Sequence, residues 1–210
     1  MRRAAAVARE DEMTITADQV KQLREQTGAG MMECKKALSE AAGDLGKAVD
    51  LLRKAGMAQA DKRSGRSASE GLVDAYIHAG SRVGVLIEVN CETDFVARTD
   101  EFAKLVRDLA LQACAAGAEY VRADEVPAPR IEKEKEIFRA QLEGSGKPAA
   151  IIEKIVEGKL AKFYSEICLL DQPFIKDDKM TVQDLVKQAS AKTGENIIVR
   201  RFVRFHLGQE

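Results

Sequence analysis

Residues 83–90 read Val-Gly-Val-Leu-Ile-Glu-Val-Asn. Branched apolar residues stand at every second position, which is typical of a strand that buries one face. A second strand-like run occupies residues 72–79, and Gly80-Ser81 between the two runs is a hairpin signal. Farther along, residues 102–109 carry apolar side chains at helical spacing. We therefore predict a β-hairpin with an amphipathic helix packed on one face of its sheet.

The segment Thr93-Asp94-Phe95-Val96 lies between the hairpin and that helix, which is expected to begin near Thr99. In one interpretation Phe95 packs beneath the helix, while Thr93 and Asp94 cap nearby backbone N–H groups. In the other, Phe95 stays at the surface and a partner covers it, because an exposed aromatic ring beside a carboxylate is poorly solvated. Strand-to-helix corners commonly end in the first way, so the residues by themselves favour packing.

The remainder of the chain predicts a helical hairpin, a further helix and a closing strand. Residues 131–142 and 148–163 alternate charged with apolar side chains around a Gly-Ser-Gly-Lys turn. This pattern is typical of an antiparallel helical hairpin, which we expect to project from the core over residues 130–165. Another helix is expected to follow Thr181. Residues 196–207 read as a strand that completes the sheet of the first hairpin, so the ends of the core domain are tied together.

The amino-terminal part predicts three short helices, each with a start and a stop signal. The first helix starts at Thr16, with Gln19 as its capping-box partner, and stops at Gly28. The second starts at Gly30 and stops at Gly43, and the third starts at Asp44 and stops at Gly56. Helices of about ten residues must pack their apolar stripes together, so we predict a three-helix module over residues 13–58. The small, polar and basic residues 59–70 read as a linker to a core domain of residues 71–210. Residues 1–12 read as a disordered extension.

Composition argues against several classes of function. The 33 basic and 34 acidic residues leave a net charge of −1, which does not favour nucleic acid as a partner. No apolar run approaches the roughly 20 residues that cross a bilayer, so we expect no contact with a membrane. The four cysteines form no metal-binding pattern with the two histidines, so we expect free thiols, no metal, no cofactor and a cytoplasmic location. No nucleophile–base constellation or phosphate-binding loop is recognisable, and we expect no enzyme.

Four segments carry a family resemblance. Residues 90–97, Asn-Cys-Glu-Thr-Asp-Phe-Val-Ala, resemble the signature of the bacterial-type elongation factor Ts family. Residues 23–38, Leu-Arg-Glu-Gln-Thr-Gly-Ala-Gly-Met-Met-Glu-Cys-Lys-Lys-Ala-Leu, resemble the amino-terminal signature of the same family. Residues 145–148, Ser-Gly-Lys-Pro, and residues 172–174, Gln-Pro-Phe, stand where that family has them. Because the four matches keep one order from about Met13 to Leu207, the chain is identified as a member of this family.

The resemblance implies an α+β fold. Its amino-terminal module would be similar to the ubiquitin-associated (UBA) domain, followed by a two-layer α/β dimerisation core with a small antiparallel sheet and a projecting helical hairpin. Longer relatives carry a duplicated core, whereas this chain has one copy, as in the short bacterial or organellar form of the family. In that form two chains pair through their sheets, which implies a homodimer. A second sheet face rich in Val and Ile would otherwise expose much apolar surface.

The resemblance also implies a function. The family promotes guanine-nucleotide exchange in translation elongation by binding the GTPase elongation factor Tu with its GDP. A wedge of this chain would disturb the magnesium and phosphate sites of that GTPase, and the amino-terminal module would grip one of its helices. With the family in view, the wedge interpretation of Phe95 replaces packing beneath the helix.

The implied contact residues fall into two groups. The wedge comprises Thr93, Asp94, Phe95 and Val96, and the module contacts are Arg24, Met31, Met32 and Lys35. Either methionine could instead fill the core of the module. One of the two is expected there, because adjacent helical positions point about 100° apart. Some relatives have a histidine near Gln112 that touches the GTPase, so the glutamine leaves that contact in doubt.

One rival function comes from the carboxyl-terminal strand. Residues 200–205, Arg-Arg-Phe-Val-Arg-Phe, interleave basic with aromatic side chains, as proteins that bind single-stranded RNA do. The stretch lacks the glycine of the RNA-recognition signature, and charged edge strands also protect sheets against aggregation. We therefore keep an RNA-binding accessory protein as the alternative, and we expect no direct contact with nucleic acid.

Overall fold

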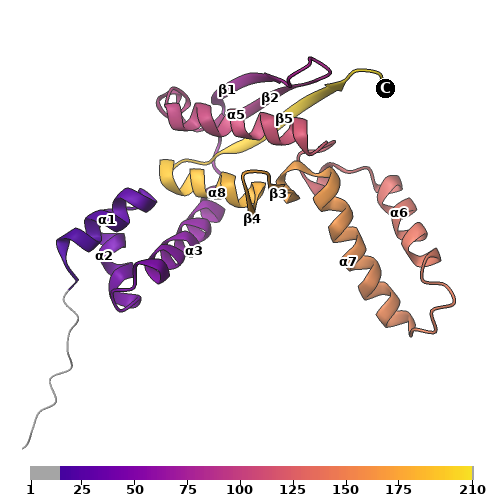
Figure 1. Cartoon of the computed structure of the whole chain (residues 1–210), viewed down its shortest axis with the longest axis horizontal. Helices are drawn as coiled ribbons and strands as arrows, with labels where there is room; N and C mark the ends of the chain where they lie inside the picture. The colour runs from indigo at the N-terminus through magenta and orange to yellow at the C-terminus, as the bar shows by residue number, and fades with distance from the viewer. Residues whose placement is uncertain (1–14, 210) are drawn as a thin grey trace, which may run out of the picture. The chain divides into compact units, whose positions relative to one another are not determined.

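The computed structural model describes residues 15–209, so the extension expected at residues 1–12 lies outside the described part of the chain. Contacts within the chain divide it into two compact units, Met1–Ala58 and Gln59–Glu210. The fold is α+β, with helices in both units and a small antiparallel sheet in the larger one (Figure 1). None of the helices within residues 15–209 combines the length and the apolar composition that a membrane crossing requires.

Three helices make up the smaller unit. They are α1 (Ala17–Thr27), α2 (Met31–Glu40) and the first part of α3 (Leu45–Arg63). Thr16 caps α1 in a capping box with Gln19, and Gly28 ends it at a φ of 68°, as predicted. The apolar stripes of the helices meet in one small core, which comprises Val20, Leu23, Cys34, Ala37, Leu38, Ala41 and Ala48. The three predicted helices are therefore present and share a core.

The third helix is longer than predicted. We expected Gly56 to end it and residues 59–70 to form a linker, but α3 continues to Arg63. Glycine at a helix end is common without being obligatory, and the alanines that follow Gly56 have the highest helix propensity. Ala60 is buried, and Asp61 pairs with Lys187 at 2.7 Å, so packing also supports the added turns.

The core of the larger unit is a three-stranded antiparallel sheet. Its strands are β1 (Glu70–Ile77), β2 (Val83–Cys91) and β5 (Ile198–His206), in the order β1-β2-β5. Gly80 and Ser81, both at positive φ, turn the predicted hairpin between β1 and β2. The predicted closing strand is β5, which pairs with β2. The first and last strands of this unit are thus held in one sheet.

Helices cover one face of this sheet. The predicted amphipathic helix is α5 (Asp100–Ala115), and Thr99 caps it by accepting a hydrogen bond from the N–H of Phe102 at 3.2 Å. Its apolar face meets the alternating side chains of β2, of which Val85, Ile87 and Val89 are almost fully buried. The helix expected after Thr181 is α8 (Val182–Thr193), which packs beside α5 and ends at Gly194 (Figure 1).

Small elements connect these layers. One-turn helix α4 (Asp94–Ala97) joins β2 to α5, and the short helices η1 (Ala123–Glu125) and η2 (Leu169–Asp171) flank the helical hairpin. A two-stranded hairpin of β3 (Pro173–Phe174) and β4 (Asp177–Thr181) was not predicted. Two residues are too few to show a strand periodicity, so β3 left no pattern in the sequence.

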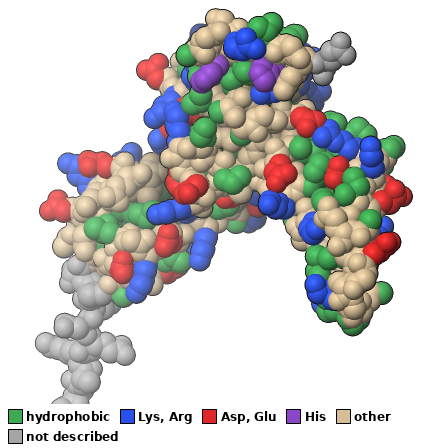
Figure 2. All heavy atoms as spheres, turned by 45° about the vertical axis from the view of Figure 1, so that its right-hand side comes forward, with side chains coloured by type: hydrophobic (Ala, Val, Ile, Leu, Met, Phe, Trp, Pro, Cys, Tyr) green, Lys and Arg blue, Asp and Glu red, His purple; other side chains and the backbone are tan. Residues whose placement is uncertain are grey.

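The predicted helical hairpin consists of α6 (Ala128–Ala140) and α7 (Ala149–Ile167). Arg139 bridges the two helices through a two-point ion pair with Glu153, at 2.9 and 3.0 Å. Hydrophobic and charged side chains alternate over the visible surface of this hairpin (Figure 2). It is therefore held together by its own contacts while leaving apolar side chains such as Ile137 and Ile151 exposed.

Candidate functional site

The corner between β2 and α5 carries the most exposed phenylalanine ring. Phe95 lies on α4 and is 79% exposed, whereas the next residues, Val96 and Ala97, turn toward the core of the larger unit. Thr93 caps α4, and its hydroxyl accepts a hydrogen bond from the N–H of Val96 at 3.4 Å. The interpretation in which Phe95 packs beneath the helix is therefore wrong, because a helix of only four residues directs consecutive side chains to different sides.

Asp94 lies beside Phe95 on the same turn. Its carboxylate pairs with Arg98, one turn later, at 2.9 Å, and the Asp94 side chain remains 44% exposed. Ion pairs of this kind on a surface are worth only about 0–1 kcal/mol. The carboxylate can therefore exchange Arg98 for another partner at little cost, and the corner presents an acidic group next to an apolar ring.

A distant segment of the chain holds the start of the corner. The carboxylate of Glu195, which follows α8, accepts hydrogen bonds from the backbone N–H groups of Glu92 (3.0 Å) and Thr93 (3.1 Å) and from the hydroxyl of Thr93 (2.6 Å). In return, the carboxylate of Glu92 accepts the backbone N–H of Asn196 at 2.6 Å. Sequence reasoning missed Glu195, because 102 residues separate it from Thr93 and no motif marks it.

The predicted residues of the amino-terminal module lie in the smaller unit. Arg24 is exposed on the last turn of α1, and Lys35 is exposed on α2. Met31 and Met32 are 57% and 78% exposed, so the expectation that one of them is internal is wrong. The first buried residue of α2 is Cys34, and the methionines precede it in the opening turn, where the helix extends past the core.

The face of the sheet opposite to α5 carries apolar side chains at the surface. In register across the three strands, Ala75, Leu86 and Val203 form one row, and Ile77, Gly84 and Phe205 form the next. The exposed large apolar residues on these strands and just after them are Val73, Ile77, Leu86, Val203, Phe205 and Leu207. Exposed apolar side chains that neighbour one another in this way are typical of surfaces that contact another molecule.

The basic residues of β5 are largely engaged within the chain. Arg201 pairs with Glu88 at 2.7 Å, and the guanidinium of Arg204 donates to the carbonyl of Cys114 at 3.4 Å. Strand alternation turns Phe202 toward the core while Phe205 points to the open face. Arg201 and Phe205 lie on the open face, whereas Phe202 and Arg204 turn toward the core, so the strand divides its basic and aromatic side chains between the two faces of the sheet.

Gln112 has an internal role. Its side chain is 1% exposed and donates to the side-chain oxygen of Gln172 at 3.1 Å. It also accepts the backbone N–H of Ile175 at 2.8 Å. The glutamine thus anchors the β3–β4 hairpin to α5, and its side chain is not placed to touch a partner.

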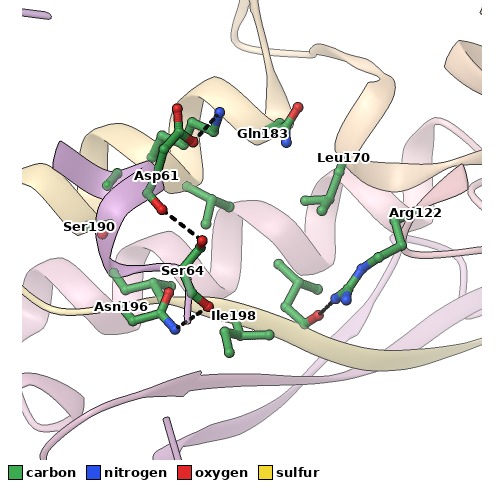
Figure 3. Close-up of a pocket in the computed structure, with 13 residues that line it drawn as sticks. Asp61, Ser64, Arg122, Leu170, Gln183, Ser190, Asn196 and Ile198 are labelled. Atoms are coloured by element: carbon green, nitrogen blue, oxygen red, sulfur yellow. Dashed lines mark hydrogen bonds and ion pairs between the residues drawn. The ribbon is translucent and has the colours of Figure 1, made fainter. Parts of the chain in front are cut away.

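A hollow of about 230 Å³ lies among the end of α3, α8 and the start of β5. Several polar groups at its wall bind other parts of the chain, as Figure 3 shows for Asn196, which donates to the carbonyl of Ser64 at 3.3 Å, and for Arg122. The guanidinium of Arg122 donates to the carbonyl of Val199 at 2.9 Å. Within the described residues, no group of three or more His, Cys, Asp or Glu side chains is arranged to hold a metal ion. The four cysteines are buried and free.

Comparison with known proteins supplies the context for these surfaces. The family model described as Elongation factor TS matches residues 4–209. The chain is 60% identical over 195 residues to Elongation factor Ts of Carboxydothermus hydrogenoformans, an alignment that covers 93% of this chain and 90% of the relative. It is also 60% identical over 195 residues to Elongation factor Ts of Moorella thermoacetica, covering 93% of this chain and 96% of the relative. The chain is 57% identical to Elongation factor Ts of Caldanaerobacter subterraneus, an alignment that covers 93% of this chain and 98% of the relative.

Proposed function

Because the chain belongs to the elongation factor Ts family, we propose that it is a guanine-nucleotide exchange factor that acts on elongation factor Tu during translation elongation. Exchange of this kind needs no reactive group. A protein that binds best to the nucleotide-free form of a GTPase weakens the binding of GDP by the same factor, since the coupling between the two ligands is reciprocal. Translation and the buried free thiols both fit a cytoplasmic location.

The wedge of this factor is the corner of Thr93 to Val96. The observation that carries the proposal is the 79% exposure of Phe95 on a turn whose neighbouring residues are capped and packed. Phe95 enters an apolar pocket between helices of the GTPase domain and displaces one of them, and this movement reaches the sites that hold magnesium and phosphate. Asp94 leaves Arg98 and competes for polar contacts in the same region. A buried aromatic anchor supplies about 2–4 kcal/mol in a typical interface.

The amino-terminal module provides a second contact. Its three helices around a small core are consistent with a fold similar to the UBA domain. Arg24 and Lys35 supply positive charge, and the exposed side chains of Met31 and Met32 adapt to an irregular groove. This contact holds the factor on the GTPase, so that the wedge can distort it without the two proteins separating.

The test is the release of a fluorescent GDP analogue from elongation factor Tu, measured by stopped flow. With Phe95→Ala we expect a loss of acceleration of at least about thirtyfold, which corresponds to the lower limit of about 2 kcal/mol for a hot spot, and a smaller loss of binding, because the module still docks. Ile175→Ala is the matched control, since Ile175 is 54% exposed in the same unit but outside the wedge. Equal acceleration by wild type and Phe95→Ala contradicts the wedge.

The open face of the sheet is the surface through which two chains pair. Support comes from the two apolar rows centred on Leu86 and Gly84, which an isolated chain would leave in water. Light scattering should give the mass of a dimer for the wild type and for Ile137→Lys, a control on the helical hairpin. Leu86→Lys should give a monomer. A wild type that is monomeric at micromolar concentration contradicts the pairing.

A further inference from the structure

The conformation of α4 cannot come from α4 itself. It has four residues, and a single helical turn fixes several backbone dihedrals for very few hydrogen bonds. Two backbone bonds close this turn, from the N–H of Ala97 to Thr93 (3.2 Å) and from the N–H of Arg98 to Asp94 (3.1 Å). Because Phe95 is exposed, its ring has little of the packing that orders most aromatic side chains. Contacts with the rest of the unit, among them the packing of Val96 and Ala97 on the core, must therefore help to hold the turn.

The contacts of Thr93 identify a further support outside the turn. Its backbone N–H and its hydroxyl both donate to the carboxylate of Glu195. Because the hydroxyl proton is committed to Glu195, an oxygen lone pair remains directed to the N–H of Val96, which is the cap of α4. Hydrogen bonds to an ionised carboxylate are roughly twice as strong as bonds between neutral groups. One carboxylate thus fixes both the backbone and the capping group of Thr93.

The backbone of Glu195 is itself held in place. The buried hydroxyl of Ser190, on α8, donates to the carbonyl of Glu195 at 2.6 Å. The N–H of Glu195 donates to the hydroxyl of Thr193 at 3.3 Å. On its other side, the Asn196 amide donates to the carbonyls of Ser64 and Arg66, and Figure 3 shows Asn196 directed toward Ser64. The end of α8 and the start of β5 therefore form a rigid base.

We propose that Glu195 is a positioning residue of the wedge: its carboxylate holds Thr93, sets the turn of α4 and so fixes the direction in which Asp94 and Phe95 meet a partner. The effect of Glu195 on nucleotide exchange rests on the proposed function, whereas its effect on the conformation of the corner does not depend on that function. Glu195 touches neither the GTPase nor its nucleotide in this scheme. Its removal lowers the rate of exchange by loosening the wedge, while the contact made by the amino-terminal module remains.

Two substitutions separate this role from general stabilisation. Glu195→Ala removes all three acceptor contacts. Glu195→Gln keeps an oxygen for the two backbone N–H groups and offers an amide N–H to the Thr93 oxygen, so it should rescue the corner. Glu125→Ala is the matched control, because the carboxylate of Glu125 also accepts a backbone N–H, that of Val121 at 3.0 Å, but in another loop.

The first measurement is amide hydrogen exchange by NMR in the full-length chain without partner. We expect Glu195→Ala to speed the exchange of the N–H groups of Glu92, Thr93 and Val96, while Glu195→Gln and Glu125→Ala leave these groups close to wild type. Unchanged exchange at Thr93 and Val96 in Glu195→Ala overturns the inference. Because no GTPase is present, this result is independent of the proposed function.

The second measurement is the release of the fluorescent GDP analogue from elongation factor Tu over a range of factor concentrations. Glu195→Ala should lower the maximum rate roughly tenfold, a moderate misplacement effect, and leave the half-saturating concentration within about twofold. Glu195→Gln should recover most of the rate, and Glu195→Ala should cause no further loss in a Phe95→Ala background. A wild-type maximum rate for Glu195→Ala, or additive losses in the double variant, overturns the inference. If Phe95→Ala alone has no effect, the wedge is wrong and amide exchange decides the role of Glu195.

Discussion

Phe95 and Phe102 are seven positions apart, and their truncation should affect stability very differently. Phe95 is 79% exposed at the corner, whereas Phe102, on the first turn of α5, is 1% exposed in the main core. If Phe95 served to pack the helix, both substitutions to alanine would destabilise the larger unit. If it is presented to a partner, only Phe102→Ala should do so.

The magnitudes follow from burial. Complete burial of a phenylalanine side chain is worth about 1.5–3 kcal/mol. Because 79% of Phe95 is exposed, its truncation removes only about a fifth of that burial free energy, so Phe95→Ala should cost about 0.3–0.6 kcal/mol of stability. Phe102→Ala leaves a cavity as well and should cost about 3–5 kcal/mol. The two free energies of unfolding should therefore differ by at least about 2 kcal/mol.

Urea unfolding monitored by tyrosine fluorescence measures this difference in the larger unit alone. The chain has no Trp, and its three tyrosines, Tyr76, Tyr120 and Tyr164, all belong to that unit. Phe95→Ala should keep the urea midpoint close to wild type, and Phe102→Ala should lower it clearly. A loss of more than about 2 kcal/mol for Phe95→Ala would refute the reasoning, since it would mean that the ring is packed in solution.

Two further predictions concern the same unit. Gly71 has a φ of 143°, and a Cβ there would collide with the carbonyl oxygen of Val89; Gly71→Ala should therefore cost more than about 2 kcal/mol in urea unfolding. Gly80→Ala, at a φ of 87° with no atom within 4 Å of its Cβ, should cost only about 1 kcal/mol of backbone strain, and equal losses would contradict the steric argument. Burial raises the pKa of Cys91 to about 11 and that of Cys168 to about 12, from an ordinary value of 9.0. Because the folded state disfavours the thiolates, the raised pKa values contribute to the free energy of unfolding, and this contribution is fully present below pH 9.0. It is lost as pH rises toward 11 and 12, so the urea midpoint should fall over that interval. The fall should be less steep in Cys168→Ala.

The sequence predicted the elements whose signals are local. Alternation in residues 83–90 identified β2 and its buried face, because a strand of period two leaves a pattern in consecutive residues. Thr16, Thr99 and Thr181 each marked the start of a helix, since a capping side chain bonds to an N–H only two or three residues away. The end of α3 was missed because its last turns are stabilised by residues far along the chain, such as Lys187.

The candidate site was predictable in its residues but not in its geometry. The corner was recognisable from Thr93-Asp94-Phe95-Val96, yet these residues by themselves favoured packing of Phe95. Exposure depends on which side chains of the turn face the core, and in α4 those are Val96 and Ala97. The support by Glu195 could not be predicted, as the end of α3 could not, because it depends on residues that are distant in sequence. Antiparallel pairing of β2 with β5 brings these residues together.

Presentation of an apolar ring to a partner imposes a physical constraint on this corner. A ring that packed against its own protein would be ordered but unavailable, and a ring on a loose loop would be available but would lose conformational entropy on binding. The corner meets both demands by fixing the backbone, through Thr93 and Glu195, and leaving the side chain of Phe95 in water. The entropy of the turn is then lost during folding of the larger unit. More of the free energy gained when Phe95 is buried therefore remains to distort the proposed GTPase, which is where an exchange factor needs it.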